Sequence, residues 1–252
     1  MKKLFKYILV LNVLIISCQS EDDLVKNNSY HLKEVGYSAR DILSNEKFTD
    51  IFVEILYVKD FKPSNEVLAS FKNFISERTF KSNINIETKL IDIPLESSYS
   101  INKIRSIEDE NRTKFSTENE LAIFILYLNG ASSNNEEDSL ILGTAYRNTS
   151  FVIFKETTDS FSDSNLFGEK NTILESAIVR HEFSHLLGLV NVGTPIIENH
   201  HDSANGAHCT SENCLMYYKM ERMNTVVNFF DQEKIPELDA FCLQDLRSNG
   251  GR

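Results

Sequence analysis

The sequence is poor in proline and in basic residues. Its 252 residues include only four prolines, and no linker rich in Pro, Gly or Ser and no internal repeat divides the chain. We therefore expect one globular domain with an extension rather than several linked domains. The 26 Lys and Arg residues are outnumbered by 37 Asp and Glu residues. Because contacts to phosphates need Lys and Arg, a nucleic-acid partner is not expected.

A hydrophobic run long enough to span a bilayer is also missing near the N-terminus. Residues 1–7 are basic and residues 8–16 are apolar, an order typical of a secretory signal that is too short for a membrane-spanning helix. The ending Ile15-Ile16-Ser17-Cys18 resembles the lipobox of bacterial lipoproteins. This resemblance implies that residues 1–17 are removed and that Cys18 is lipidated. In the alternative, a plain signal peptide, Cys18 has no role.

The segment after Cys18 begins with the acidic residues QSEDD. It resembles the surface-export signal of Bacteroidetes lipoproteins, which implies a lipid-anchored, surface-exposed protein of the outer membrane. Residues 18–45 are polar and mixed, so we expect a tether with a short helix at SARDILS. The folded domain is expected to occupy residues 46–252.

Hydrophobic patterns predict an α/β (α+β) domain. Strands are expected at 50–58, 84–93 and 120–130, with helices at 65–79 and 100–115 between them. The continuous apolar run at 120–130 is typical of a central strand covered on both faces. Residues 139–156 predict a hairpin, or an edge strand with a return. The expected architecture is a twisted mixed sheet of about five strands with packed helices.

The helix predicted at 171–188 carries two histidines one turn apart. His181 and His185 continue the apolar stripe of Leu174 and Ile178, so both face inward. Their rings can converge on a zinc ion about 2.0–2.1 Å from each nitrogen. Glu182, next to the first histidine, can reach a zinc-bound water as a general base. In the alternative, the two histidines are ordinary core residues.

The stretch HEFSHLLGLVN resembles the metzincin motif HExxHxxGxxH. It matches through Gly188, but Asn191 stands at the place of the third histidine. Downstream, HCTSENCLM at 208–216 is similar to the H-C-x4-C-x-M stretch of archaemetzincins. The resemblance implies a metzincin-like zincin fold with an insertion at 191–207 and His208 as the third zinc ligand. Three alternative candidates for the third zinc ligand lie inside the insertion: His200, His201 and Asp202.

The same resemblance implies roles for residues around His208. Met216 corresponds to the methionine beneath the zinc, and Tyr218 to a tyrosine that stabilises the oxyanion in some metzincins; a buried tyrosine with a backbone partner is the alternative. Archaemetzincins continue with a C-x-x-C pair that helps to hold a structural zinc. Because this chain has only Cys242 there, one catalytic zinc is expected. We expect a disulfide between Cys209 and Cys214, with Cys242 left as a buried thiol.

The chain also resembles flavobacterial lipoproteins identified as membrane metalloproteases. These resemblances imply a monomeric zinc metalloendopeptidase, with His181, His185 and His208 on the metal and Glu182 as the base. Its partners would be a peptide or protein substrate and, through the lipid, a membrane. The alternative is a lipid-anchored binding protein that catalyses nothing and uses the metal only to brace its fold.

Overall fold

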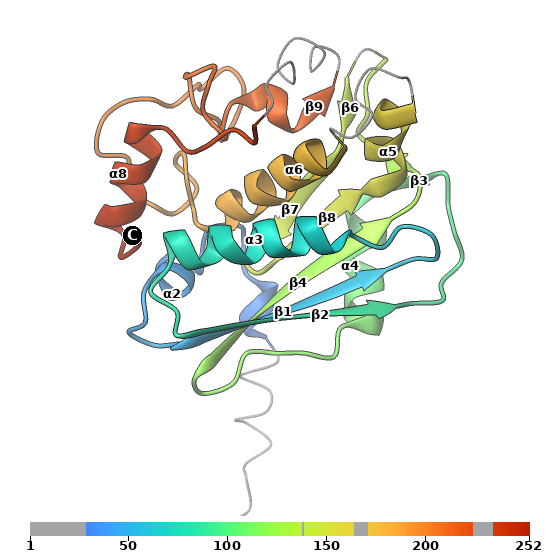
Figure 1. Cartoon of the computed structure of the whole chain (residues 1–252), viewed down its shortest axis with the longest axis horizontal. Helices are drawn as coiled ribbons and strands as arrows, with labels where there is room; N and C mark the ends of the chain where they lie inside the picture. The colour runs from blue at the N-terminus through green and yellow to red at the C-terminus, as the bar shows by residue number, and fades with distance from the viewer. Residues whose placement is uncertain (1–28, 138, 164–170, 224–233) are drawn as a thin grey trace, which may run out of the picture.

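A five-stranded mixed sheet forms the centre of the structure (Figure 1). The computed structural model describes residues 29–137, 139–163, 171–223 and 234–252, so the predicted signal and Cys18 lie outside the described residues. The strand order is β2-β1-β4-β8-β7, with four parallel strands and β7 antiparallel at one edge. The strands are β1 (Asp50–Tyr57), β2 (Asn83–Leu90), β4 (Glu120–Leu128), β7 (Gly143–Arg147) and β8 (Ser150–Phe154). The predicted α/β fold and hairpin are confirmed.

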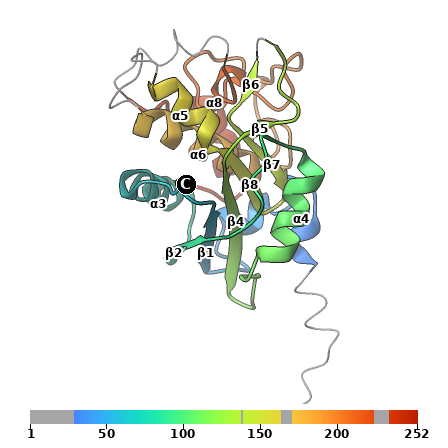
Figure 2. The same cartoon turned by 90° about the vertical axis from the view of Figure 1, so that its right-hand side faces the viewer.

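Helices cover both faces of the sheet (Figure 2). Helices α3 (Asn65–Arg78) and α6 (Asn171–Leu186) pack on one face, and α4 (Ile101–Asn111) packs on the other. Strand β4 serves both layers, because alternate side chains of a strand point to opposite faces. Ile123 and Ile125 belong to the core under α6, whereas Phe124 and Leu126 pack towards α4. The prediction of a central strand covered on both sides is confirmed.

A serine residue caps the N-terminus of α3 and another caps that of α4. Ser64 Oγ accepts a hydrogen bond of 3.3 Å from Val67 N at the start of α3. Ser100 Oγ accepts one of 3.2 Å from Lys103 N at the start of α4. Each cap pairs a backbone N–H that lacks a partner within its helix, which stabilises a helix by typically ~1 kcal/mol.

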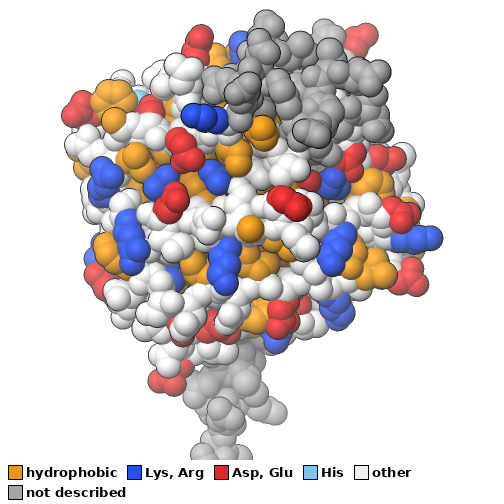
Figure 3. Space-filling view, in the orientation of Figure 1, with side chains coloured by type: hydrophobic (Ala, Val, Ile, Leu, Met, Phe, Trp, Pro, Cys, Tyr) orange, Lys and Arg blue, Asp and Glu red, His pale blue; other side chains and the backbone are white. Residues whose placement is uncertain are grey.

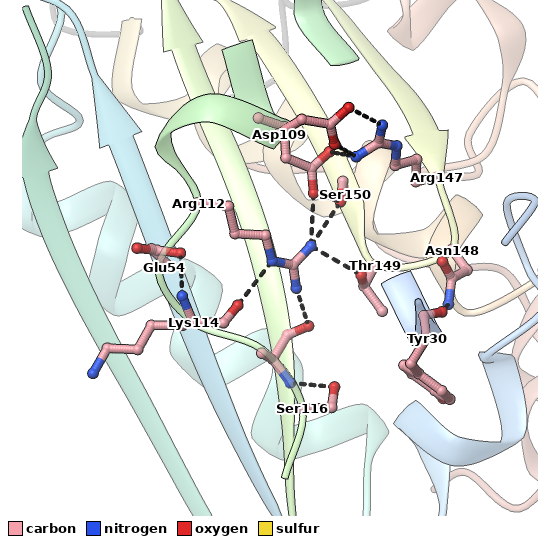
Figure 4. A network of polar contacts seen from close by, with 12 residues as sticks. Tyr30, Glu54, Asp109, Arg112, Lys114, Ser116, Arg147, Asn148, Thr149 and Ser150 are labelled. Carbon is pink, nitrogen blue, oxygen red and sulfur yellow. Dashed lines mark hydrogen bonds and ion pairs between the residues drawn. The ribbon is translucent and has the colours of Figure 1, made fainter. Parts of the chain in front are cut away.

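The N-terminal segment is folded against the domain. It contains a 3-10 turn, η1 (Tyr30–Leu32), and the short helix α2 (Ala39–Leu43) that the sequence predicts at SARDILS. Ile42 and Leu43 are fully buried in the main core. The Asn148 side chain accepts a hydrogen bond from Lys33 N. It also donates one to Tyr30 O (Figure 4). The folded part therefore begins before residue 46, earlier than the predicted tether allows.

A buried ionic network holds α4 to the sheet (Figure 4). Arg112 donates to Glu108 Oε1 at 2.7 Å and to Ala122 O of β4 at 3.0 Å. Arg147 lies 3.0 Å from Glu108 Oε2 and also pairs with Asp109. Because Glu108 and Arg112 are paired away from water, loss of one of these two partners would leave a buried charge uncompensated at a cost of about 3–5 kcal/mol.

Short elements above the sheet complete the domain. They are α5 (Lys155–Asp163), β3 (Ser98–Tyr99) paired with β5 (Ala131–Ser132), β6 (Leu140–Ile141) paired with β9 (Arg222–Met223), η3 (Tyr218–Met220) and the C-terminal helix α8 (Ala240–Ser248). On the face in Figure 3, Lys and Arg side chains are interspersed with Asp and Glu side chains. Within the described residues, no helix combines the length and apolarity needed to cross a bilayer.

Candidate metal centre

Helix α6 places both predicted histidines inside the molecule. His181 is fully buried, and only 8% of His185 is exposed. The helix ends at Leu186, and the chain turns at Gly188, whose φ is +72°. A Cβ at Gly188 would lie 2.7 Å from Thr194 N, so both the backbone conformation and the lack of space require glycine.

The two histidines of α6 point at each other. Their Nε2 atoms are 3.2 Å apart, and His181 Nδ1 lies 2.7 Å from the carbonyl oxygen of Leu215. The Nδ1–H of His181 therefore donates to that carbonyl, which leaves the Nε2 lone pair facing His185. In metal sites, the ring nitrogen that does not bind the metal commonly donates to a backbone carbonyl, and this hydrogen bond orients the histidine.

His208, rather than its rivals in the insertion, completes this group. Its ring stacks on His181 with centroids 5.2 Å apart and lies 5.3 Å from His185. His208 Nδ1 is 2.6 Å from Asn205 O, so its Nε2 also presents a lone pair to the cluster. His201 bonds to Gly206 O, and the side chain of Asn191 is exposed, with a φ of +67°.

Glu221 joins the three histidines as a residue that the sequence does not predict. One donor atom from each of His181, His185, His208 and Glu221 lies within 4.8 Å of the others. Glu221 Oε2 is 3.1 Å from His208 Nε2. Glu221 follows Met216 by five residues, and no motif surrounds it. The one feature of the sequence that could have indicated a further metal ligand was an acidic residue shortly after the methionine.

Glu182 lies fully buried beside the cluster. Its Oε2 accepts a 2.8 Å hydrogen bond from Ala145 N of β7, whereas Oε1 has no hydrogen-bond partner in the described part of the chain. Gly143 makes room for this carboxyl group, because a Cβ there would lie 2.7 Å from Glu182 Cγ. Burial, with Glu221 as the second cause, raises the pKa of Glu182 well above its ordinary value, and the Ala145 N–H opposes that rise.

The donor set fits a divalent cation. Burial, and then the neighbouring His208, lower the pKa of His181 to about 4, and burial lowers the pKa of His185 well below its ordinary value. Both rings are therefore neutral at pH 7 and present lone pairs. Among the described residues, His208 Nε2 and Glu182 Oε1 are buried polar atoms without a hydrogen-bond partner. Three imidazoles with a nearby carboxylate are a typical zinc-binding set.

The residues after His208 border the cluster. Met216 is fully buried, and its carbonyl oxygen accepts a 2.8 Å hydrogen bond from Cys209 N. Tyr218, at the start of η3, lines a cavity of about 470 Å³ together with His208 and Arg222. A second cavity of about 340 Å³ reaches Glu182 and His185. Solvent-sized space therefore adjoins the cluster on the side of Tyr218 and on the side of Glu182.

The predicted disulfide between Cys209 and Cys214 is wrong. Cys209, Cys214 and Cys242 are free and fully buried. Cys214 Sγ lies 3.6 Å from Cys242 Sγ, although these residues are far apart in the sequence. Cys242 is therefore a buried thiol, as expected, but it belongs to a cluster. The spacing of Cys209 and Cys214 suggested a closed loop, whereas both thiols are free and share a cluster with Cys242 of the C-terminal helix α8.

A second candidate metal site is formed by His200, Cys209, Asp239 and Cys242, and Cys214 lies beside Cys242. His200 Nδ1 lies 3.3 Å from Cys209 Sγ and 3.9 Å from Cys242 Sγ. Its Nε2 is 2.7 Å from Asp245 of α8, which orients the ring. Hydrogen bonds from the Cys209 and Cys242 thiols lower the pKa of Cys214 to about 4, as suits a thiolate ligand. The expected single catalytic zinc ion stays a prediction beside this second group of possible ligands.

Asp239 shows why the sequence did not reveal this second site. It precedes Cys242 by three residues, where a C-x-x-C pair would have its first cysteine. Its carboxylate instead caps α8 by accepting from Cys242 N at 2.9 Å and also receives the Cys209 thiol. The second site could have been indicated by the pattern Asp-x-x-Cys at 239–242, together with the several possible metal ligands next to His200 in the sequence.

Comparisons with known proteins identify the fold. The structure is similar to the archaemetzincin of Methanopyrus kandleri, with a TM-score of 0.51 and 15% identity over 80% of this chain and 96% of that one. Weaker likenesses are to a zinc-dependent peptidase from Methanocorpusculum labreanum (TM-score 0.48, 14% identity, covering 77% of this chain and 99% of that one) and to metalloproteinase-II from Bacteroides fragilis (0.39, 14%, covering 90% and 60%). No protein-family model matches the sequence, and no curated protein matches it. The predicted metzincin-like fold is confirmed: the chain has an archaemetzincin-type zinc peptidase fold.

Proposed function

We propose that this chain is a zinc-dependent peptidase that hydrolyses peptide bonds. His181, His185 and His208 would hold the zinc ion, and Glu182 would be the general base. The observation that carries this proposal is the convergence of three imidazole nitrogens at one buried point beside a buried carboxyl group. The fold shared with the Methanopyrus kandleri archaemetzincin supports it.

The chemistry assigns separate tasks to the two oxygens of Glu182. A bound zinc ion supplies a Lewis acid that polarises a peptide carbonyl and lowers the pKa of water towards about 7. Glu182 Oε2 is held by Ala145 N, which fixes the direction of the carboxyl group. Oε1 lacks a hydrogen-bond partner within the described residues, so it takes the proton of the attacking water and then gives it to the leaving amine.

The substrate would approach along β7 and past Tyr218. Strand β7 is an edge of the main sheet, and an extended peptide can add to such an edge as a further strand. Tyr218 borders the cavity next to His208, from which its hydroxyl group would donate to the developing oxyanion.

Glu182→Gln tests the reaction directly. The amide keeps the size of the side chain but takes no proton, so cleavage of a broad peptide library should fall by about 10²- to 10⁴-fold. Zinc content, measured by elemental analysis of protein lacking residues 1–18, should stay equal to that of the unaltered chain. Equal cleavage by both proteins would rule out Glu182 as the base.

A metal-braced binding protein is the second candidate, and Glu221 favours it. A catalytic zinc site keeps one position open, whereas four protein ligands close a structural one. Stoichiometric zinc with no cleavage of any peptide, in the unaltered chain and in variants of Glu221, would support this second candidate.

We also propose a second, structural zinc ion held by His200, Cys209, Cys214 and Cys242. For Zn–S bonds of 2.3 Å, tetrahedral geometry puts two sulfur atoms about 3.8 Å apart. The 3.6 Å between Cys214 and Cys242 is close to that separation. Elemental analysis should give two zinc ions per chain, and Cys242→Ser should reduce this number to one.

The lipid anchor is a separate part of the proposal. Cys18, in its lipobox-like setting, would carry the lipid and hold the peptidase on the outer surface of the outer membrane. Incorporation of labelled fatty acid into the full chain, lost in Cys18→Ser, would support this. Release of an unlipidated chain from cells would contradict it.

A further inference from the structure

The backbone fixes the position of Glu221 at the metal centre. The Glu221 carbonyl oxygen accepts a 3.1 Å hydrogen bond from Leu142 N, and the next residue, Arg222, pairs with Ile141. Only 16% of the Glu221 side chain is exposed, and its carboxylate lies 3.1 Å from His208 Nε2. The carboxylate is therefore held towards the histidines by the pairing of β6 with β9.

The separation of these two donor atoms matches that of two metal ligands. His208 Nδ1 lies 2.6 Å from Asn205 O, which orients the ring with Nε2 towards Glu221. One donor atom from each of His181, His185, His208 and Glu221 lies within 4.8 Å of the others. Two ligands of a tetrahedral zinc, each at 2.0–2.1 Å, are separated by about 3.3 Å.

The composition of the site also favours a cation. Glu182 and Glu221 bring two carboxyl groups to the same site as the three histidines. The side chain of Arg222, 42% exposed, lies 4.0 Å from Glu136 instead. A divalent ion among His181, His185, His208 and Glu221 would neutralise both carboxylates, as buried charges require.

We propose that Glu221 is a fourth protein ligand of the catalytic metal and occupies the position that water or substrate needs. The enzyme would then rest in a closed state and become active when the carboxylate leaves the metal. This inference rests on the proposed peptidase function and adds regulation of the same site. The segment from Leu142 to Ala145 contacts both Glu221 and Glu182, so a peptide docked along β7 would act on the closing carboxylate directly.

Cobalt substitution distinguishes a closed site from an open one. The metal in the unaltered chain is replaced by Co²⁺, and its visible absorption is followed while azide, a small anionic ligand, is added. With four protein ligands, the spectrum should not respond to azide. In Glu221→Ala, the vacated position should bind azide and change the spectrum in a saturable way.

Activity provides the second measurement. If the open form makes up 1–10% of the unaltered enzyme, Glu221→Ala should cleave peptides about 10- to 100-fold faster. Glu221→Gln, which keeps the size but not the charge, is used if the alanine variant does not fold. Glu198→Ala is the matched control, because Glu198 is an exposed residue of the preceding loop, and it should behave like the unaltered chain in both measurements.

Two results would overturn the inference. An unaltered chain that binds azide as Glu221→Ala does would show that Glu221 is no ligand, and the proposed peptidase function would stand. A Glu221→Ala variant that binds azide but cleaves no faster would refute the closed resting state. Absence of cleavage in every metal-loaded variant would count against the proposed function, while the azide comparison would still decide whether Glu221 binds the metal.

Discussion

At the scale of single residues, backbone groups decide which atoms face the metal. Leu215 O and Asn205 O each hold the Nδ1 of one histidine, and Ala145 N holds one oxygen of Glu182. Such outer contacts fix the ring tautomer and orientation before a metal binds. The sequence shows the histidines and the glutamate but not these contacts, because they come from loops and from β7.

Gly143 tests how closely Glu182 is packed. In Gly143→Ala, the new Cβ would lie 2.7 Å from Glu182 Cγ and 2.9 Å from its Oε1. We expect the variant to lose about 1–3 kcal/mol of unfolding free energy, as overpacked sites do, and to lose peptidase activity because the base is displaced. Denaturant unfolding and peptide cleavage measure the two effects.

A double-mutant cycle serves as the control for this prediction. Glu182→Ala removes the atoms that the new methyl group meets, so adding Gly143→Ala to it should cost less stability than in the unaltered chain. Equal costs in both backgrounds would mean that the loss arises elsewhere, for example from Ile178, whose Cγ2 would lie 3.0 Å from the same Cβ.

At the scale of elements, two helical turns and one long loop supply the metal centre. Helix α6 brings His181 and His185 from one face, and the loop that follows Gly188 returns with His208. Asn191 occupies the position of the third histidine in the metzincin motif, but its side chain is exposed and its φ is +67°. In the proposed site, His208 thus takes the place of that histidine.

If His208 is the third ligand, removing it should weaken zinc binding, and a histidine introduced at residue 191 should not restore that binding. His208→Ala should lower zinc affinity by more than the roughly 10- to 100-fold typical of an outer-shell change. Adding Asn191→His should not restore it, since residue 191 is exposed whereas the three histidines are buried. Chelator competition gives both affinities. Recovery of zinc binding in the double variant would show that residue 191, and not His208, is placed at the metal.

Local patterns predict the elements well and the site in part. The run at 120–128 and the stripe of α6 predict β4 and the inward histidines, because strand and helix periodicity depend on neighbours in the sequence. Glu221 depends on the pairing of two-residue strands, and Cys242 meets Cys214 across distant segments. Such contacts have no periodicity, which is why the sequence missed Glu221 and led to the wrong disulfide.

At the scale of the whole molecule, the second cluster joins the insertion to the C-terminal helix. His200 and Cys209 come from the loop after α6, whereas Cys242 and Asp245 belong to α8 (Figure 1). We expect Cys242→Ser to lower the unfolding temperature and to remove the stabilisation that added zinc gives at this cluster. Differential scanning calorimetry with and without zinc measures this, and an unchanged unfolding temperature would argue against a structural ion there.

The most direct test of the metal centre is diffraction from crystals grown with zinc, recorded at energies on both sides of the zinc absorption edge. We predict an anomalous peak about 2.0–2.1 Å from one ring nitrogen each of His181, His185 and His208, and a separate peak among His200 and the three thiols. Histidine rings turned apart, with no peak between them, would contradict the peptidase proposal and leave only a folded domain of archaemetzincin-like shape.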